Sequence, residues 1–150
     1  MALKARIKDE MKAALLSGDR FVGETLRNLT AAILDEEVKL GKRDEGLSDE
    51  EIEKVVAREV KKRNESAKIY RDNNRPDLAK PEEREIEILQ AYLPKQLDET
   101  ELAAIIEAKI AELSVTGPQV MGQVIGAVKK QVGNAADGAA IARIVKQKLN

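Results

Sequence analysis

The chain has 150 residues, a length that suits one domain or two small subdomains. It contains no cysteine and no histidine, which excludes disulfides, a thiolate nucleophile, the usual zinc ligands and the commonest general base. Only 2% of the residues are aromatic, whereas Ala, Glu, Lys and Leu are abundant, and this composition favours helices over sheets. We therefore expect no metal site and no cofactor.

The sequence gives no sign of membrane targeting or insertion. Residues 1–11 alternate charged and apolar side chains and no apolar stretch follows them, so no signal peptide is expected. No run of 18 apolar residues occurs, so no membrane span and no membrane partner are expected. The absence of cysteine fits a reducing compartment, and we expect a cytoplasmic location.

Charge is distributed unevenly along the chain. The formal net charge is −1, but the residues from Gly117 onward contain five basic side chains and a single acid, Asp137. This segment therefore carries +4, which leaves −5 for the rest of the chain. A basic tail on an acidic body suggests a polyanionic partner for the tail.

Apolar residues recur at helical spacing from the start of the chain. Steps of four predict a first helix with one apolar face, formed by Leu3, Ile7, Met11 and Leu15. Ser17-Gly18-Asp19 ends this helix, because glycine readily adopts the left-handed conformation that stops a helix. A second helix is predicted over residues 20–40, closed by Gly41.

A capping box opens the third predicted helix. The Ser48 hydroxyl can accept a hydrogen bond from the Glu51 amide, and the Glu51 carboxylate can accept one from the Ser48 amide. The buried side of this helix is predicted to be Ile52, Val56, Val60, Ala67 and Tyr70.

Residues 73–76 interrupt the helical pattern of apolar residues. Because Pro76 and Pro81 suit the first turns of short helices, a fourth helix is predicted over residues 82–92.

Pro94 marks the predicted subdomain boundary, because proline disfavours helical torsions at the residue before it. Three more helices follow: a fifth begun by a capping box of Asp98 and Glu101, a sixth begun by Gly117-Pro118, and a seventh capped by Asp137. The sequence therefore predicts an all-α protein. An elongated helical subdomain is expected in residues 1–93 and a small three-helix subdomain in residues 94–150.

The sharpest local motif is a pair of glycines, Gly122 and Gly126, four residues apart on one face of the sixth helix. Each glycine weakens a helix by about 1 kcal/mol relative to alanine, so the pair needs a physical reason. One interpretation, which we favour from the sequence, is close packing of another helix within the tail. The other is a smooth surface for a sugar–phosphate backbone, and it gains from Lys129 and Lys130 one turn further on.

The basic residues of the tail also allow two interpretations. Cations near the C-terminal ends of helices interact favourably with the helix dipole, which alone would account for Lys129, Lys130 and Lys146. They could equally neutralise RNA phosphates, and the candidate RNA-binding residues are Gly122, Gly126, Lys129, Lys130, Arg143, Lys146 and Lys148. Residues 94–150 contain no aromatic side chain on which a base could stack, so contact would be to backbone and shape.

The sequence contains no catalytic motif that we can recognise. Adjacent carboxylates such as Glu36 and Glu37 point in different directions on a helix and are expected to be solvated. No phosphate-binding glycine loop, zinc-protease motif or hydrolase elbow occurs. We therefore assign no catalytic residues.

Several segments, taken in order and over essentially the full length, resemble the GatB/YqeY family. They are Leu26-Arg27-Asn28-Leu29, Arg58 to Ser66, Asp77-Leu78-Ala79, Glu85-Ile86, Tyr92-Leu93-Pro94-Lys95-Gln96-Leu97, Met121 to Lys129, Ala136-Asp137-Gly138 and Val145-Lys146. The chain departs from the family at Gly133-Asn134-Ala135, where relatives often carry two additional positive charges.

The family is similar to the C-terminal tail of GatB, a subunit of the tRNA-dependent amidotransferase that converts Glu-tRNA(Gln) or Asp-tRNA(Asn) to the amide. In that enzyme the tail reads tRNA shape and the chemistry lies elsewhere. Similar domains are appended to some glutaminyl-tRNA synthetases. The resemblance implies a role in translation with tRNA as partner, together with amidotransferase subunits or an aminoacyl-tRNA synthetase.

Three hypotheses remain open at this point. The first is a tRNA-binding accessory protein of aminoacyl-tRNA amidation, without activity of its own. The second is a protein-interaction module whose acidic helical body binds a basic partner. The third is a carbon–nitrogen ligase, with glutamine as amide donor, that acts only together with other subunits.

Overall fold

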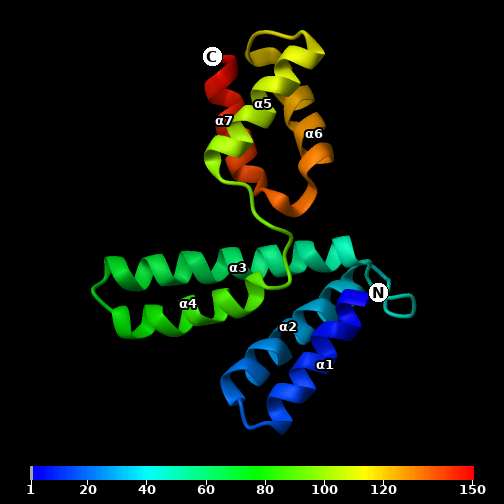
Figure 1. Cartoon of the computed structure of the whole chain (residues 1–150), viewed down its shortest axis with the longest axis vertical. Helices are drawn as coiled ribbons and strands as arrows, with labels where there is room; N and C mark the ends of the chain where they lie inside the picture. Colours follow the sequence, from blue (N-terminus) through cyan, green and yellow to red (C-terminus); the bar gives the residue numbers. More distant parts are fainter. Residues whose placement is uncertain (1) are drawn as a thin grey trace. The chain divides into compact units, whose positions relative to one another are not determined.

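The computed structural model describes residues 2–150, and the all-α prediction is confirmed (Figure 1). The described part of the chain contains no strand. Two single turns of 3₁₀ helix flank α6 at Pro118–Val120 and Gly133–Ala135. The helices are α1 (Ala2–Leu16), α2 (Arg20–Lys39), α3 (Asp49–Asp72), α4 (Pro76–Gln90), α5 (Glu99–Leu113), α6 (Met121–Val132) and α7 (Gly138–Leu149).

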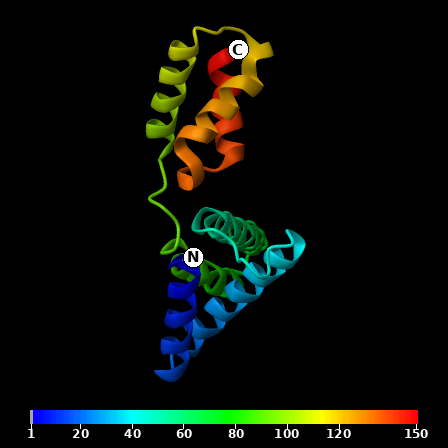
Figure 2. The ribbon, with the colours of Figure 1, turned by 90° about the vertical axis from the view of Figure 1, so that its right-hand side faces the viewer.

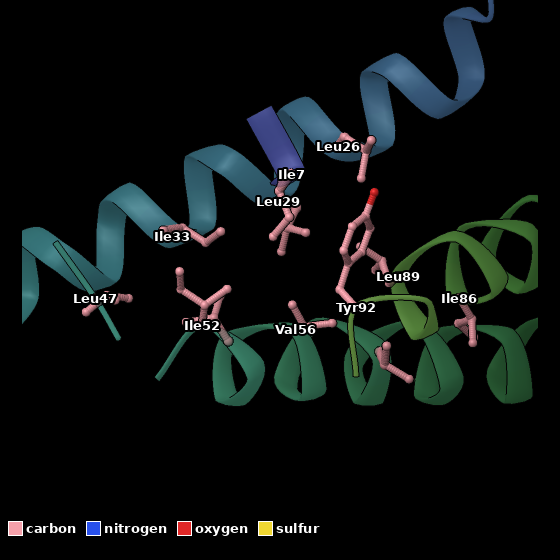
Figure 3. Close-up of a cluster of buried hydrophobic side chains, with 12 residues drawn as sticks. Ile7, Leu26, Leu29, Ile33, Leu47, Ile52, Val56, Ile86, Leu89 and Tyr92 are labelled. Carbon is pink, nitrogen blue, oxygen red and sulfur yellow. The ribbon is translucent and has the colours of Figure 1, made fainter. Parts of the chain in front are cut away.

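The chain forms two compact units, one ending at Leu93 and the other running from Pro94 to Asn150. The first unit consists of two helical hairpins, α1 with α2 and α3 with α4 (Figure 1). Aliphatic side chains of α2, α3 and α4 converge on one core together with the ring of Tyr92 (Figure 3). The fully buried members of this core include Ile7, Leu29, Leu47, Ile52, Val56 and Leu89.

The apolar face of α1 differs from the prediction at its C-terminal end. Ile7 is buried as expected, but Leu15 is 42% exposed and Ala14 is buried instead. The reason is that a step of four residues exceeds the 3.6 residues of a helical turn, so the predicted row rotates away from the core. Tyr70 in α3 is likewise only half-buried.

The predicted start of the fourth helix is wrong. The helix α4 begins at Pro76 and continues through Pro81 to Gln90, whereas the sequence suggested residues 82–92. Pro76 occupies the first turn, where a missing amide hydrogen costs nothing. Pro81 lies in the interior, and packing holds the helix intact around it, because Ala79 before it and Ile86 and Leu89 after it are buried.

The second unit is a bundle of α5, α6 and α7, in which α6 and α7 lie side by side (Figure 2). Its separate core is formed by Leu102, Ile106, Val124, Val128, Ile141, Ile144, Val145 and Leu149. The Asp98–Glu101 capping box at the start of α5 is present as predicted. Asp137 does occupy the N-cap position of α7, but its side chain accepts no capping hydrogen bond.

Among residues 2–150, every helix is too short or too polar to cross a membrane.

Candidate nucleic-acid interface

One face of α6 is built for the core and the opposite face carries the candidate residues. Val124 and Val128, one turn apart, are completely buried in the second unit. At about 100° per residue, positions 122, 126, 129 and 130 fall on the far side of the helix from these two valines. The structure accordingly exposes Gly122, Gly126, Lys129 and Lys130 together. We call these four residues the α6 glycine–lysine face.

The helix-packing interpretation of the glycine pair is wrong. A Cβ atom built on Gly122 or on Gly126 would meet nothing within 4 Å. The α5 and α7 helices pack against the valine side of α6, and the described chain leaves the glycine side uncovered. Two glycines therefore weaken an exposed stretch of helix without relieving any contact within residues 2–150.

The lysines beyond the glycines keep their charges available. Lys129 and Lys130 are exposed, and neither forms a salt bridge with any residue between 2 and 150. The Lys129 side chain extends towards the start of α7, where its Nζ lies 3.4 Å from the position that a Cβ on Gly138 would occupy. Two unneutralised ammonium groups thus follow the open glycine surface directly.

The basic residues of α7 fall into two groups. Arg143 forms an ion pair with Glu99, and Lys148 pairs with Glu107 at 2.5 Å, so both side chains are engaged with α5. Lys146 is exposed and forms no such pair with the described residues. The seven predicted residues are therefore not equivalent, because a phosphate can reach Lys129, Lys130 and Lys146 without displacing a carboxylate.

The loop that follows α6 is held by residues that the sequence analysis did not single out. Gly133 has φ 55° and ψ −131°, a conformation essentially restricted to glycine. The Leu97 amide donates a hydrogen bond to the Ala135 carbonyl at 2.8 Å, and the Gln96 side-chain amide donates one to the Asn134 carbonyl at 3.0 Å. Gln96 and Leu97 belong to one of the segments that resemble the family. That resemblance is the feature of the sequence that could have marked them as important.

The described chain offers no sign of a metal centre. Between residues 2 and 150, no group of three or more acidic side chains is arranged to hold a metal ion. What α6 does present is the two exposed ammonium groups of Lys129 and Lys130 and an open helix surface at Gly122 and Gly126.

Comparison with known proteins assigns the family. The sequence model of the family described as Yqey-like protein matches residues 4–149. A curated relative from Eremothecium gossypii, named Altered inheritance of mitochondria protein 41, mitochondrial, is 33% identical over 143 residues, which cover 90% of this chain and 76% of the relative. The protein of the same name from Lachancea thermotolerans is 29% identical over 149 residues, covering 97% and 78%.

The names of these two relatives place them in mitochondria, so they do not confirm the expected cytoplasmic location. The family match extends over both compact units and includes every segment on which the resemblance was based. The chain belongs to the Yqey-like protein family.

Proposed function

We propose that this protein is a tRNA-binding accessory protein, without catalytic activity of its own, that holds the phosphate backbone on the α6 glycine–lysine face. The observation that carries this proposal is the uncovered glycine pair followed by two unpaired lysines. The similarity of the family to the tail of GatB, a tRNA-dependent amidotransferase subunit, supports tRNA as the nucleic acid.

The proposed contact has two parts: the RNA backbone approaches the α6 helix closely, and lysines neutralise its phosphates. With no Cβ at positions 122 and 126, a sugar–phosphate backbone can approach the helix more closely than any other residue would permit. Lys129 and Lys130 then replace the counterions of the adjacent phosphates. Because residues 94–150 contain no aromatic side chain, binding would depend on RNA shape and charge.

Arg143 and Lys148 have secondary roles in this proposal. A phosphate that binds either side chain must compete with Glu99 or Glu107. Both ion pairs are exposed, so their strength is modest and they can exchange. Lys146 can bind a phosphate without first breaking an ion pair. Together with Lys129 and Lys130 it gives three lysines that can do so.

The same proposal implies protein partners and is compatible with either of two compartments. Amidotransferase subunits or an aminoacyl-tRNA synthetase would supply the chemistry, and any carbon–nitrogen ligase activity would require them. We expected a cytoplasmic protein, whereas the named yeast relatives are mitochondrial. Translation with tRNA takes place in both compartments, so the proposed contact is the same in either.

Titration of labelled tRNA at several salt concentrations tests the proposal. Each phosphate neutralised contributes a slope of roughly −0.9 to the logarithm of affinity against the logarithm of salt concentration on a duplex. With the two lysines of this face and Lys146 of α7, we expect the tail to contribute a slope of about −2 to −3. Replacing Lys129 and Lys130 together by Ala should reduce the magnitude of the slope by up to about two, because two contacts are lost.

The double variant Lys8→Ala/Lys12→Ala provides the matched control. These two lysines are exposed on α1 and removing them changes the net charge equally. Equal tRNA binding by the Lys129→Ala/Lys130→Ala variant and the wild type would remove the α6 face as the site. A flat salt response would remove phosphate binding altogether and would favour the protein-interaction module.

A further inference from the structure

The N-terminal unit also carries a concentrated patch of positive charge, although the body of the chain is acidic. Between residues 54 and 62 of α3, every exposed residue is basic: Lys54, Arg58, Lys61 and Lys62. The other side of this stretch is fixed in the core by Val55, Val56 and Val60. We call the four exposed residues the α3 basic face.

Two half-buried carboxylates of α3 beside this face are engaged in ion pairs. Glu51 pairs with Lys42 at 2.5 Å, and Glu59 accepts from Arg63 at 3.3 Å as well as from Lys62 at 3.4 Å. None of these carboxylates is itself an exposed residue of α3. Between Lys54 and Lys62 the exposed side chains are therefore all basic, and Glu59 is half-buried beside them.

Within the face, the pairing that the structure shows is partial. Arg58 contacts Glu36 of α2 at 3.0 Å, while its side chain remains 54% exposed. The Lys62 side chain is 72% exposed, and its Glu59 partner also binds Arg63. Lys54 forms no salt bridge with the rest of the described chain, residues 2–150.

The spacing of the charges fits an extended polyanion. Lys54, Arg58 and Lys62 follow one another at four-residue steps, which corresponds to about 6 Å per step along a helix. Like charges at this spacing destabilise a helix, and a ligand with repeated negative charges would relieve that repulsion. No aromatic residue lies among positions 54–62, so such a ligand would again be bound through its backbone.

A second lysine row shows that spacing alone does not create such a surface. Lys8 and Lys12 in α1 are also four residues apart and exposed, but Asp9 and Glu10 are exposed beside them. The positive electrostatic potential of Lys8 and Lys12 is therefore partly cancelled by these neighbouring acids. The α3 basic face, by contrast, has no exposed acid between its first and last residues.

We propose that the α3 basic face is a second RNA phosphate-binding surface, formed by residues of the N-terminal unit and sharing none with the α6 glycine–lysine face. The inference rests on the proposed function, because it takes tRNA as the polyanion. Its charges lie on a 24-residue helix whose opposite side is part of the core, so their spacing is fixed before any ligand binds.

The test uses the full-length chain and labelled tRNA at several salt concentrations. In the variant Lys54→Gln/Lys62→Gln, glutamine keeps a similar helix propensity while removing both charges. We expect weaker tRNA binding and a salt slope smaller in magnitude by about one to two. The control Lys8→Gln/Lys12→Gln removes the same charge at the same spacing and should bind nearly as the wild type does. Circular dichroism establishes that both variants are folded.

The outcomes separate this inference from the proposed function. If Lys54→Gln/Lys62→Gln binds as its control does, the α3 basic face is excluded, and Lys129→Ala/Lys130→Ala still tests the α6 face. If only the α3 variant weakens binding, the inference holds and the α6 site fails. If the wild type does not bind tRNA, both are overturned.

Competition with polyglutamate distinguishes RNA from an acidic protein. We expect tRNA to remain bound when polyglutamate is added at an equal concentration of negative charge. Displacement that disappears in the Lys54→Gln/Lys62→Gln variant would identify an acidic polypeptide as the partner of the α3 basic face and would overturn the RNA assignment.

Discussion

Gly18 and Gly122 both have open space around them, yet the two positions need glycine for different reasons. Gly18, between α1 and α2, has φ +84°, a backbone conformation that other residues adopt only with strain. Gly122 lies in regular α-helix, where alanine is the more favourable residue. The backbone conformation therefore explains why residue 18 is a glycine. At position 122 the glycine needs another explanation, and close approach of a ligand supplies one.

Alanine substitution is expected to separate these two roles. Gly122→Ala and Gly126→Ala should each raise the free energy of unfolding by roughly 0.5–1 kcal/mol, because alanine is the better helix former and meets no neighbour. Gly18→Ala should lower it, because alanine is strained at positive φ. Urea denaturation followed by circular dichroism measures all three.

The same alanine variants on α6 should bind tRNA less tightly, since a methyl group would hold the RNA backbone away from the helix. A gain in stability together with a loss of binding is the combination expected of a ligand surface. If Gly122→Ala and Gly126→Ala instead destabilise the protein, a contact that covers this side of α6 must exist.

At the scale of a helix, the start of α3 shows how local hydrogen bonds and an ion pair cooperate. The Ser48 hydroxyl accepts from the Glu51 amide at 3.2 Å, and the Glu51 carboxylate accepts from the Ser48 amide at 2.8 Å. Lys42 donates to the same carboxylate at 2.5 Å. Chiefly through Lys42, and secondly through the Ser48 amide, these bonds lower the pKa of Glu51 from 4.5 to about 2.

The stability that this charge provides should depend on pH. Because the pKa of Glu51 is lower in the folded state, its contribution is fully present above about pH 4.5 and is lost as the pH falls through about 2. We expect Glu51→Gln to unfold at a lower urea concentration than the wild type at neutral pH. The difference should shrink steadily as the pH approaches 2.

Glutamine can still accept the hydrogen bond from Ser48, so the substitution removes the charge and leaves the cap. The control is Glu65→Gln, an exposed carboxylate of the same helix that forms no salt bridge with residues 2–150. A difference between Glu51→Gln and the wild type that does not change with pH would show that the charge adds no stability to the cap.

At the scale of the whole molecule, two hydrophobic cores lie in two compact units. Leu89 is completely buried in the core of the first unit, and Val128 is completely buried in the core of the second. Each core is formed by residues of its own unit. Units with separate cores can unfold separately, in which case a single free energy of unfolding does not describe the chain.

Core substitutions should therefore act within one unit. Leu89→Ala is expected to cost about 2–5 kcal/mol and to accelerate amide hydrogen exchange in residues up to 93. Val128→Ala removes fewer atoms, and its smaller effect should be confined to residues 94–150. Hydrogen exchange resolved along the chain measures both. Equal loss of protection in the two units from either substitution would show that they unfold as one.

The sequence by itself determined the helical class, the family and the two capping boxes, whereas the side chain of the predicted cap Asp137 forms no capping hydrogen bond. The capping boxes of Ser48 with Glu51 and of Asp98 with Glu101 are present as predicted, because both hydrogen bonds of a box join residues three apart. The start of α4 was misplaced for the opposite reason. Local propensity stops a helix at Pro81, while burial of Ala79 against the rest of the first unit carries the helix through it.

The candidate site required the tertiary structure. Gly122 and Gly126 are four apart whether they pack against a helix or face solvent, and only the placement of α5 and α7 leaves them uncovered. The basic residues of the tail are equally charged in the sequence, but Arg143 and Lys148 are paired with glutamates 44 and 41 residues away. Exposure and charge pairing depend on which distant side chains the fold brings together, and helical periodicity carries no information about them.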